Sequence, residues 1–284
     1  MLNQWSAQLP PTPPTVNFSV PARPRLRELG YDLTQISPLR RGISVVAPFF
    51  YAAGYFVLAT HQKWAEAISF LVVLSFVTYG SVSHDLVHAN LGFPKRTNDF
   101  LLVLIELLAL RSGTAYRLVH LHHHKRYPAD DDIEGAAAKM TLVGSLIEGI
   151  LFQTRIYNWA WKRYPRYRYR LGFEGALIGA VYITSIAVLP WYKAPFVYAS
   201  LMTIGAWIIP LITSWIPHVP SGLDEIHQTR AFRGVVIKIL AWDHLYHLEH
   251  HLYPAVPHQN WPELARRLDP FLYRVRIRPT RLWF

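Results

Sequence analysis

Residues 65–88 read AEAISFLVVLSFVTYGSVSHDLVH and join an apolar stretch directly to a pair of histidines. The part from Ala65 to Ser83 is close to the ~20 apolar residues that a helix needs to cross about 30 Å of hydrocarbon. His84 and His88 follow it at a spacing of four, which places two imidazoles on one face of a continuing helix. The stretch therefore predicts a membrane-spanning helix whose end carries metal ligands.

Three further stretches have the composition of a membrane span. They run from Ile43 to Thr60, from Gly172 to Trp191 and from Phe196 to Ile216, and short connectors group the four spans into two helical hairpins. Two shorter apolar runs, 100–110 and 142–152, each contain a glutamate, and we expect re-entrant or interfacial helices there. The predicted fold is an all-α integral membrane protein with four transmembrane helices.

The composition excludes several other classes of protein and site. The 284 residues, 51% of them hydrophobic, suit one large domain, and the absence of cysteine excludes disulfides, thiolate zinc sites and cysteine-ligated iron–sulfur clusters. Residues 1–38 contain seven prolines and no apolar segment of the kind found in a signal peptide. We expect a disordered, proline-rich tail over 1–38 and a single membrane domain over 39–284.

The basic residues predict how the chain lies in the membrane. The two hairpin tips hold only Lys63 and Lys193, so the other 27 of the 29 lysines and arginines fall on the opposite side. The positive-inside rule makes that side, with both termini, cytoplasmic. The run KRYPRYRYR at 162–170 mixes basic and aromatic residues, which favours a membrane-interface belt that contacts lipid headgroups over nucleic-acid binding.

Two more histidine clusters repeat the pattern of the first. Residues 120–124 read HLHHH and residues 247–251 read HLEHH, so each H-x-x-H-H gives three imidazoles within one helical turn. One further histidine follows the fourth span in WIPHVP. Because the second and fourth spans both end on the cytoplasmic side, all of these histidines are expected on one membrane face. The candidate metal ligands are His84, His88, His120, His123, His124, His218, His247, His250 and His251.

The remaining histidines are assigned other roles. His122 lies off the shared face of its helix, and His61, His227 and His258 are isolated and expected to be structural. His244, three residues before His247, is either a tenth ligand or a group that supports one.

Carboxylates next to the clusters are candidates to accept an imidazole N–H and so fix the orientation of a ligand. They are Asp85, Asp243, Glu249 and the run Asp130, Asp131 and Asp132, for which solvated surface charge is the alternative.

Nine imidazoles exceed the needs of one ion, since zinc takes four ligands. Two ions with four or five imidazoles each fit the count, but imidazole suits zinc, copper, iron and nickel alike. A zinc pair would suit hydrolysis, whereas an iron pair activates O₂. The metalloprotease spacings H-E-x-x-H and H-x-x-E-H do not occur, and the predicted spans contain no histidine of the kind expected in a metal transporter.

The three histidine segments resemble the histidine boxes of the membrane fatty-acid desaturase and hydroxylase superfamily. The boxes correspond to HDLVH (84–88), HLHHH (120–124) and HLEHH (247–251). The longer segment HLEHHLYPAVP is similar to one common among bacterial acyl desaturases, while HDLVH and WIPHVP also resemble carotenoid ketolases and β-carotene hydroxylases. At Asp243-His244 the sequence departs from acyl desaturases, which often have asparagine there and can make a water-mediated metal contact.

The resemblance implies four transmembrane helices below a cytosolic helical cap that holds two iron ions, with O₂ as cosubstrate. It implies abstraction of hydrogen from a lipid C–H bond, followed by a second abstraction or by oxygen rebound. Fatty acyl desaturation is the first expectation, and carotenoid-ring hydroxylation or ketolation is the alternative. Other lipid oxygenation and a non-enzymatic metal-binding or transport role are the remaining readings.

The electrons for such chemistry are expected from outside the chain. The sequence has no flavin or nucleotide fingerprint and no fused haem or iron–sulfur module. A ferredoxin or a cytochrome b5-like protein is therefore the expected donor, and the basic cytoplasmic face would attract an acidic carrier.

Overall fold

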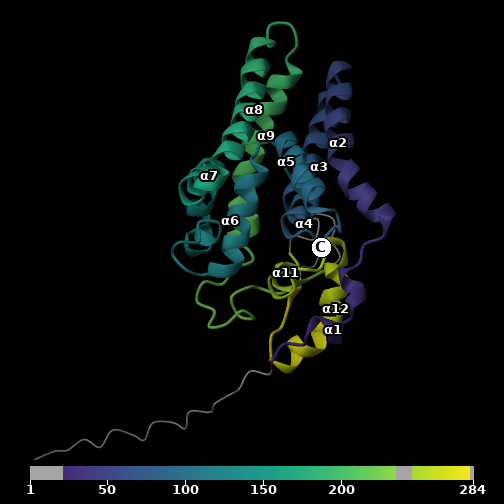
Figure 1. Cartoon of the computed structure of the whole chain (residues 1–284), viewed down its shortest axis with the longest axis vertical. Helices are drawn as coiled ribbons and strands as arrows, with labels where there is room; N and C mark the ends of the chain where they lie inside the picture. Colours follow the sequence, from purple (N-terminus) through teal and green to yellow (C-terminus); the bar gives the residue numbers. More distant parts are fainter. Residues whose placement is uncertain (1–21, 235–244, 282–284) are drawn as a thin grey trace, which may run out of the picture.

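A computed structural model describes residues 22–234 and 245–281, and this part of the chain is mostly helical (Figure 1). Within these two ranges the only paired strands are the two-residue β1 (Phe232–Arg233) and β2 (Thr280–Arg281), which run parallel. The prediction of a helical protein is confirmed for the described residues.

Within the described residues ten α-helices of six or more residues carry the architecture, and short helical turns connect them. The main helices are α2 (Pro38–Thr60), α3 (Trp64–Val77), α4 (Ser83–His88), α5 (Lys95–Leu108), α6 (Gly113–Arg126), α7 (Leu142–Arg163), α8 (Arg168–Ala187), α9 (Ala194–Gly205), α11 (His247–Leu252) and α12 (Trp261–Arg274). The short turns are α1 (Leu26–Leu29), η1 (Tyr31–Thr34), η2 (Thr78–Val82), η3 (Gly135–Lys139), η4 (Pro165–Tyr167), η5 (Ala206–Ile208), η6 (Leu211–Trp215) and η7 (His258–Asn260).

Three helical segments of the described chain are long and apolar enough to cross a membrane, judged by length and composition. They cover Tyr31–Thr60, Trp64–His88 and Ala194–Trp215. α8, which corresponds to the expected span from Gly172 to Trp191, is not among them. Arg170 and Glu174 occupy its first turns and shorten its apolar length. Three of the four expected spans therefore have such a helix.

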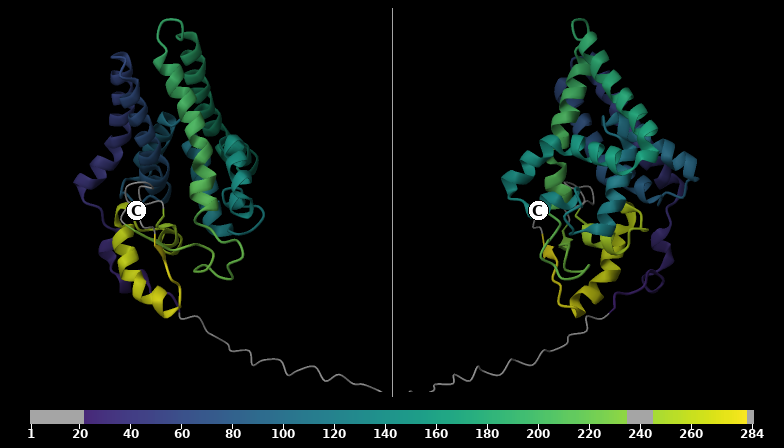
Figure 2. Two further views of the ribbon diagram at one scale, coloured as in Figure 1. Left: turned by 180° about the vertical axis from the view of Figure 1, so that it is seen from behind. Right: turned by 60° about the vertical axis from the view of Figure 1, so that its left-hand side comes forward.

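Two helical hairpins extend toward one end of the molecule, and the C-terminal helices lie at the other end. Figures 1 and 2 show α2 with α3 and α8 with α9 pointing away from α11 and α12. The hairpins are joined by a buried hydrogen bond in which the Tyr55 hydroxyl donates to the Ala194 carbonyl at 2.8 Å. This arrangement leaves the lower ends of the spans facing α11.

The ends of the helices follow ordinary capping rules. Ser37, just before Pro38, accepts a hydrogen bond from the Arg40 amide at 3.3 Å and so begins α2. Thr141 and Ser112 accept hydrogen bonds in the same way at the starts of α7 and α6. The starts of these helices are therefore readable from the sequence.

The two short apolar runs belong to helices longer than themselves. Run 100–110 lies mainly in α5, and run 142–152 forms the first half of α7, which crosses the direction of the hairpins (Figure 2). Val143 and Ile147 on α7 are 63% and 59% exposed, as expected for an interfacial helix. Gly149 allows α7 to approach η5 closely, because a Cβ there would lie 1.8 Å from the Trp207 carbonyl oxygen.

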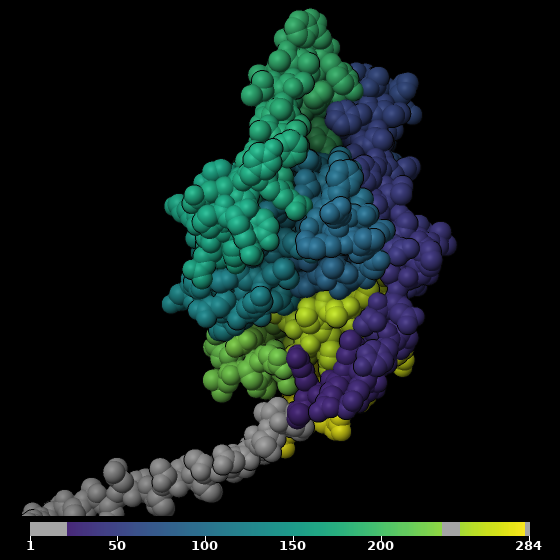
Figure 3. All heavy atoms as spheres, in the orientation of Figure 1, coloured from purple at the N-terminus to yellow at the C-terminus, as the bar shows by residue number. Residues whose placement is uncertain are grey.

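The structure differs from the predicted N-terminal tail over residues 26–34. Residues 1–21 lie outside the described residues, but α1 and η1 pack against α12, and Leu29 and Leu33 are buried in its apolar core. Figure 3 shows the purple N-terminal residues lying on the yellow C-terminal ones. Arg267 strengthens the contact with an ion pair to Asp32 at 2.6 Å. The prediction of a disordered tail through residue 38 is wrong for residues 26–34, since their apolar side chains complete the C-terminal core.

Two π-helical turns, η2 and η6, each end shortly before a candidate ligand. η2 ends at Val82, two residues before His84, and η6 ends at Trp215, three residues before His218. A π-turn holds one more residue than an α-turn, so it rotates the side chains that follow it around the helix axis. The two turns therefore set the direction in which these imidazoles point.

Candidate metal centre

Five histidines from three helices meet at the lower ends of the spans. α4 provides His84 and His88, α6 provides His120 and His124, and α11 provides His250. One nitrogen from each side chain lies within 4.8 Å of the corresponding nitrogens of the other four. The helices thus bring together residues 166 positions apart in the sequence.

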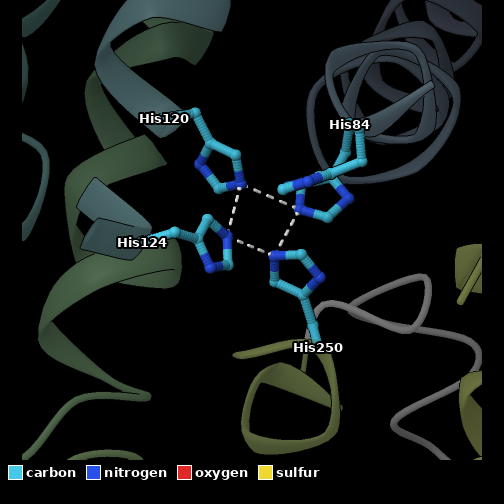
Figure 4. Close-up of side chains that lie close together, drawn as sticks. His84, His120, His124 and His250 are labelled. Atoms are coloured by element: carbon cyan, nitrogen blue, oxygen red, sulfur yellow. Dashed lines mark hydrogen bonds between the residues drawn. The ribbon is translucent and has the colours of Figure 1, made fainter. Parts of the chain in front are cut away.

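Four of these nitrogens form a closed ring (Figure 4). The Nε2 to Nε2 distances are 3.1 Å from His84 to His120, 3.1 Å from His120 to His124, 2.6 Å from His124 to His250, and 3.0 Å from His250 to His84. A neutral imidazole nitrogen either donates or accepts, so a ring of four cannot satisfy all four contacts with two-centre hydrogen bonds. Converging lone pairs of this kind fit a bound cation.

The fifth nitrogen supports the same interpretation. Nε2 of His88 is buried and has no hydrogen-bond partner among the described residues. A buried polar atom without a partner is costly unless something else satisfies it. Coordination of a metal by this nitrogen would satisfy it.

A second group contains the other four candidate ligands, His123, His218, His247 and His251. Nε2 of His218 lies 3.2 Å from Nε2 of His123 and 3.2 Å from that of His247, and Nε2 of His251 lies 3.0 Å from that of His247. The nine candidates therefore gather into a group of five and a group of four. Adjacent histidines on α6 and on α11 belong to different groups, so the two groups lie next to each other.

Burial and mutual proximity keep several of these imidazoles neutral. Burial lowers the pKa of His250 well below its usual range, and the neighbouring imidazoles of His84 and His124 lower it further. Burial and then His124 lower the pKa of His251 in the same way. Neutral imidazole is the form that binds metal, so both groups are suited to ligation at physiological pH.

Two carboxylates contact the Nδ1 atoms of clustered imidazoles and so fix the orientation of the rings. His123 Nδ1 lies 2.7 Å from Asp132 Oδ2, and His120 Nδ1 lies 2.9 Å from Glu134 Oε1. Burial lowers the pKa of His123, but the Asp132 carboxylate outweighs it and leaves that pKa raised. Such contacts leave Nε2 of each ring free to bind a metal ion.

The sequence reasoning did not include Glu134. It lies two residues after the acidic run that was considered, and only the turn at 129–134 brings it to His120.

Other expected supporting carboxylates lie elsewhere. Asp131 has a side chain that is 41% exposed and contacts Arg126 and His122, so its assignment beside a ligand is wrong. The chain turns at this point and directs Asp132 inward instead. Asp130 pairs with Lys139 at 2.6 Å.

Asp85 and Glu249 also contact side chains that lie outside the two histidine groups. Asp85 Oδ2 lies 2.6 Å from Nδ1 of His258, and Glu249 pairs with Arg233 at 2.7 Å. Each carboxylate lies one or two residues from a ligand in a helix, a spacing that directs it away from the ligand face. His258 is structural in the sense expected, since it ties η7 to α4 through Asp85.

The remaining histidines that were considered take no place in either group. His122 lies against Trp159, with ring centroids 4.8 Å apart, and away from the site as predicted. His227 pairs with Asp224 at 2.8 Å. Asp243 and His244 lie outside the described residues.

Replacing Asp132 by asparagine is expected to weaken metal binding or turnover by roughly 10- to 100-fold, because His123 loses the carboxylate that orients it. Metal affinity measured by competition with a chelator, together with turnover, tests this. Asp131→Asn is the matched control in the neighbouring position, and it should change neither quantity. Equal losses in both variants would contradict the role given to Asp132.

Comparison with known families gives one result. The model of the family described as "Fatty acid desaturase" matches residues 62–283, which include every histidine of the two groups. No curated protein sequence matches the chain.

Proposed function

Because the chain belongs to the fatty acid desaturase family, we propose that it is a di-iron enzyme that uses O₂ to desaturate the acyl chain of a membrane lipid. Family membership and the three apolar helices make it an integral membrane oxidoreductase with a histidine cluster suited to metal. The identity of the metal, the substrate and the reaction outcome are the parts that we propose.

The observation that carries the substrate class is an apolar pocket that opens at the outer surface of the spans and extends inward toward the histidines. The pocket has a volume of about 340 Å³ and lies between α3 and the α9–η6 segment. Val72 and Ile204 on its wall are each 51% exposed, so its mouth opens where lipid would surround the protein. A lipid tail could enter such a mouth without passing through water.

The inner end of this pocket adjoins a small cavity beside the clustered histidines. Tyr79 and Thr213 line both the apolar pocket and a much smaller cavity, of about 20 Å³, that is also lined by His84, His120 and His247. These two residues form the neck between the pocket and the site. An unbranched methylene chain suits so narrow a neck better than the substituted ring of a carotenoid, which favours acyl desaturation over the carotenoid alternative.

The neck is held rigidly by its neighbours. The Tyr116 hydroxyl donates to the Tyr79 carbonyl at 2.9 Å, and the two rings stack with centroids 4.5 Å apart. The guanidinium of Arg111 lies 4.9 Å from the centre of the Tyr79 ring and forms a buried ion pair with Glu106 at 2.8 Å. A fixed neck would decide which carbon of the chain stops beside the ligands.

Two irons, held by His84, His88, His120, His124 and His250 and by His123, His218, His247 and His251, would supply the power to oxidise an unactivated C–H bond with O₂. The imidazoles fix the ions, and Asp132 and Glu134 fix the imidazoles. The apolar walls align the chain and keep water from the reacting carbon. The protein thus positions the acyl chain and excludes water from the reacting carbon.

The function is tested by expressing the chain in a host that makes both unsaturated lipids and β-carotene, and by mass spectrometry of the lipid extract. Loss of two hydrogens from an acyl chain is expected. Addition of oxygen to a carotenoid, or a ketone in its ring, would overturn the proposed substrate class.

Thr213→Trp is expected to lower turnover by about 100-fold, because an indole in the neck displaces the chain from the ligands. The metal content should stay unchanged, since Thr213 belongs to neither histidine group. Ile183→Trp, on an exposed position of α8, is the control for added bulk and should turn over normally. Unimpaired turnover by Thr213→Trp would remove the case for entry through this pocket.

We also propose that α8 is a fourth span and that the histidines face the cytoplasm. The placement of Lys63 and Lys193 at the hairpin tips supports this topology. Single cysteines at these positions can be labelled cleanly because the chain has none of its own. Labelling from the non-cytoplasmic side is expected, and labelling of position 193 from the cytoplasmic side alone would refute four spans.

An acidic carrier, a ferredoxin or a cytochrome b5-like protein, is proposed as the electron donor. The net charge of +11 supports electrostatic attraction of such a partner. Carrier-dependent turnover should fall as salt rises, since exposed charges are screened beyond about 8–10 Å near physiological ionic strength. A rate independent of salt would count against this docking.

A further inference from the structure

A second cavity lies on the side of α6 that faces away from the clustered histidines. Its volume is about 380 Å³, and it is enclosed by α5, the η4 turn, the first turn of α8 and α6. On α6 the spacing separates the two sites, because Arg117, Leu121 and Lys125 follow one another at four-residue intervals on a different face from His120 and His124. The cavity is therefore separate from the metal centre, although one helix builds both.

The cavity is strongly cationic. Its lining includes five basic side chains, Lys95, Arg117, Lys125, Arg166 and Arg170, and one carboxylate, Asp99. Asp99 is shared among three of them: Lys95 Nζ lies 2.7 Å from it, Arg170 Nη1 lies 3.7 Å from it, and Arg117 contacts its other oxygen. Arg170 also pairs with Glu174 at 3.3 Å, so two carboxylates face three cations and this cluster keeps positive charge.

Two of the cations have no acidic partner in the described part of the chain. Lys125 and Arg166 are exposed, and neither makes an ion pair with any residue in 22–234 or 245–281. Arg166 instead lies over the ring of Tyr167, 4.9 Å from its centroid. Both side chains are thus available to an anionic ligand.

The surroundings of the cavity are those of a membrane interface. Leu118 and Leu121 add an apolar wall, and Tyr164 and Tyr167 add aromatic rings. Phe100 and Phe173 lie close in sequence to the lining residues Asp99 and Arg170, and they are 63% and 56% exposed. An amphipathic ligand could place its charge among the cations and its apolar part along these exposed side chains.

We propose that this cavity binds the phosphate headgroup of an anionic phospholipid. Guanidinium groups match the oxygens of a phosphodiester, and basic pockets beside membrane helices favour anionic lipid headgroups. A zwitterionic lipid would bring its own cation into a site that already holds an excess of positive charge. This inference does not depend on the reaction that the histidines catalyse.

The test is native mass spectrometry of the full chain in detergent, titrated with phosphatidylglycerol, phosphatidylcholine or inorganic phosphate. Phosphatidylglycerol should bind at least about tenfold more tightly than phosphatidylcholine. The double variant Lys125→Gln/Arg166→Gln should weaken phosphatidylglycerol binding by roughly tenfold or more. Both changed residues are exposed, so the variant should fold.

Two further variants separate this site from general surface charge. Arg274→Gln/Arg278→Gln removes the same charge from two exposed residues that lie outside both the cavity lining and the run 162–170, and it should bind as the unaltered chain does. Lys125→Arg/Arg166→Lys keeps the charge and should retain binding.

Equal binding of the two lipids, or equal losses in the two glutamine variants, would overturn the proposal. Inorganic phosphate that binds as tightly as phosphatidylglycerol would also overturn it, since the site would then recognise a free anion.

Discussion

Replacing His250 by alanine is expected to lower turnover by more than about 100-fold and to remove one metal ion from each chain. His250 is fully buried, and its Nε2 closes the ring of four nitrogens with His84 and His124. Truncation leaves the other lone pairs facing a gap and takes away a direct bond to the ion, a larger loss than that of a supporting carboxylate. Metal analysis and turnover of the purified variant measure the two effects.

The control for this substitution is His61→Ala. His61 lies at the C-terminal end of α2, far in sequence from any clustered residue and outside both groups. It should keep full metal content and full turnover. His123→Ala, in the other group, should lose as much activity as His250→Ala while sparing the five-histidine group. If His61→Ala lost as much as either, the clusters would not be the site.

Loading the protein with zinc in place of iron is expected to abolish turnover completely, and reconstitution with iron is expected to restore it. Imidazole binds both metals, so occupancy alone does not distinguish them. Zinc does not change its oxidation state, and no C–H oxidation by O₂ is possible through a redox-silent ion. Anaerobically purified protein should bind about two irons per chain, as two groups of four and five imidazoles require.

The zinc-loaded and iron-loaded samples must contain the same amount of metal per chain. Zinc-loaded and iron-loaded samples of one preparation should be assayed with O₂ and the same reduced carrier, after metal analysis of each. Thr213→Trp serves as a second reference, because it should bind iron normally and still turn over slowly. Activity that persists with zinc alone would contradict the redox mechanism. The two histidine groups would still be a metal-binding site.

The sequence by itself determined the helical class, the position of three spans and the nine clustered histidines. These properties are local: an apolar run sets a membrane helix, and four-residue spacing places His84 beside His88 whatever surrounds them. The spacing also directed His122 away from the site, where it lies against Trp159. The number of ligands indicated two ions for the same reason, since it is a count of residues and not of contacts.

Only the tertiary structure decided how the ligands divide and what supports them. His123 and His124 are neighbours in sequence but belong to different groups, and the partners that assign them come from α11 and from the segment that follows η6. Asp132 and Glu134 face ligand rings while Asp131 faces solvent, because the turn after α6 selects which carboxylates point inward. Tyr79 and Thr213, which form the neck, lie in the π-turns η2 and η6, and no pattern in the sequence predicted these turns. Contacts between segments so far apart depend on the packing of whole helices, which periodicity within one segment does not encode.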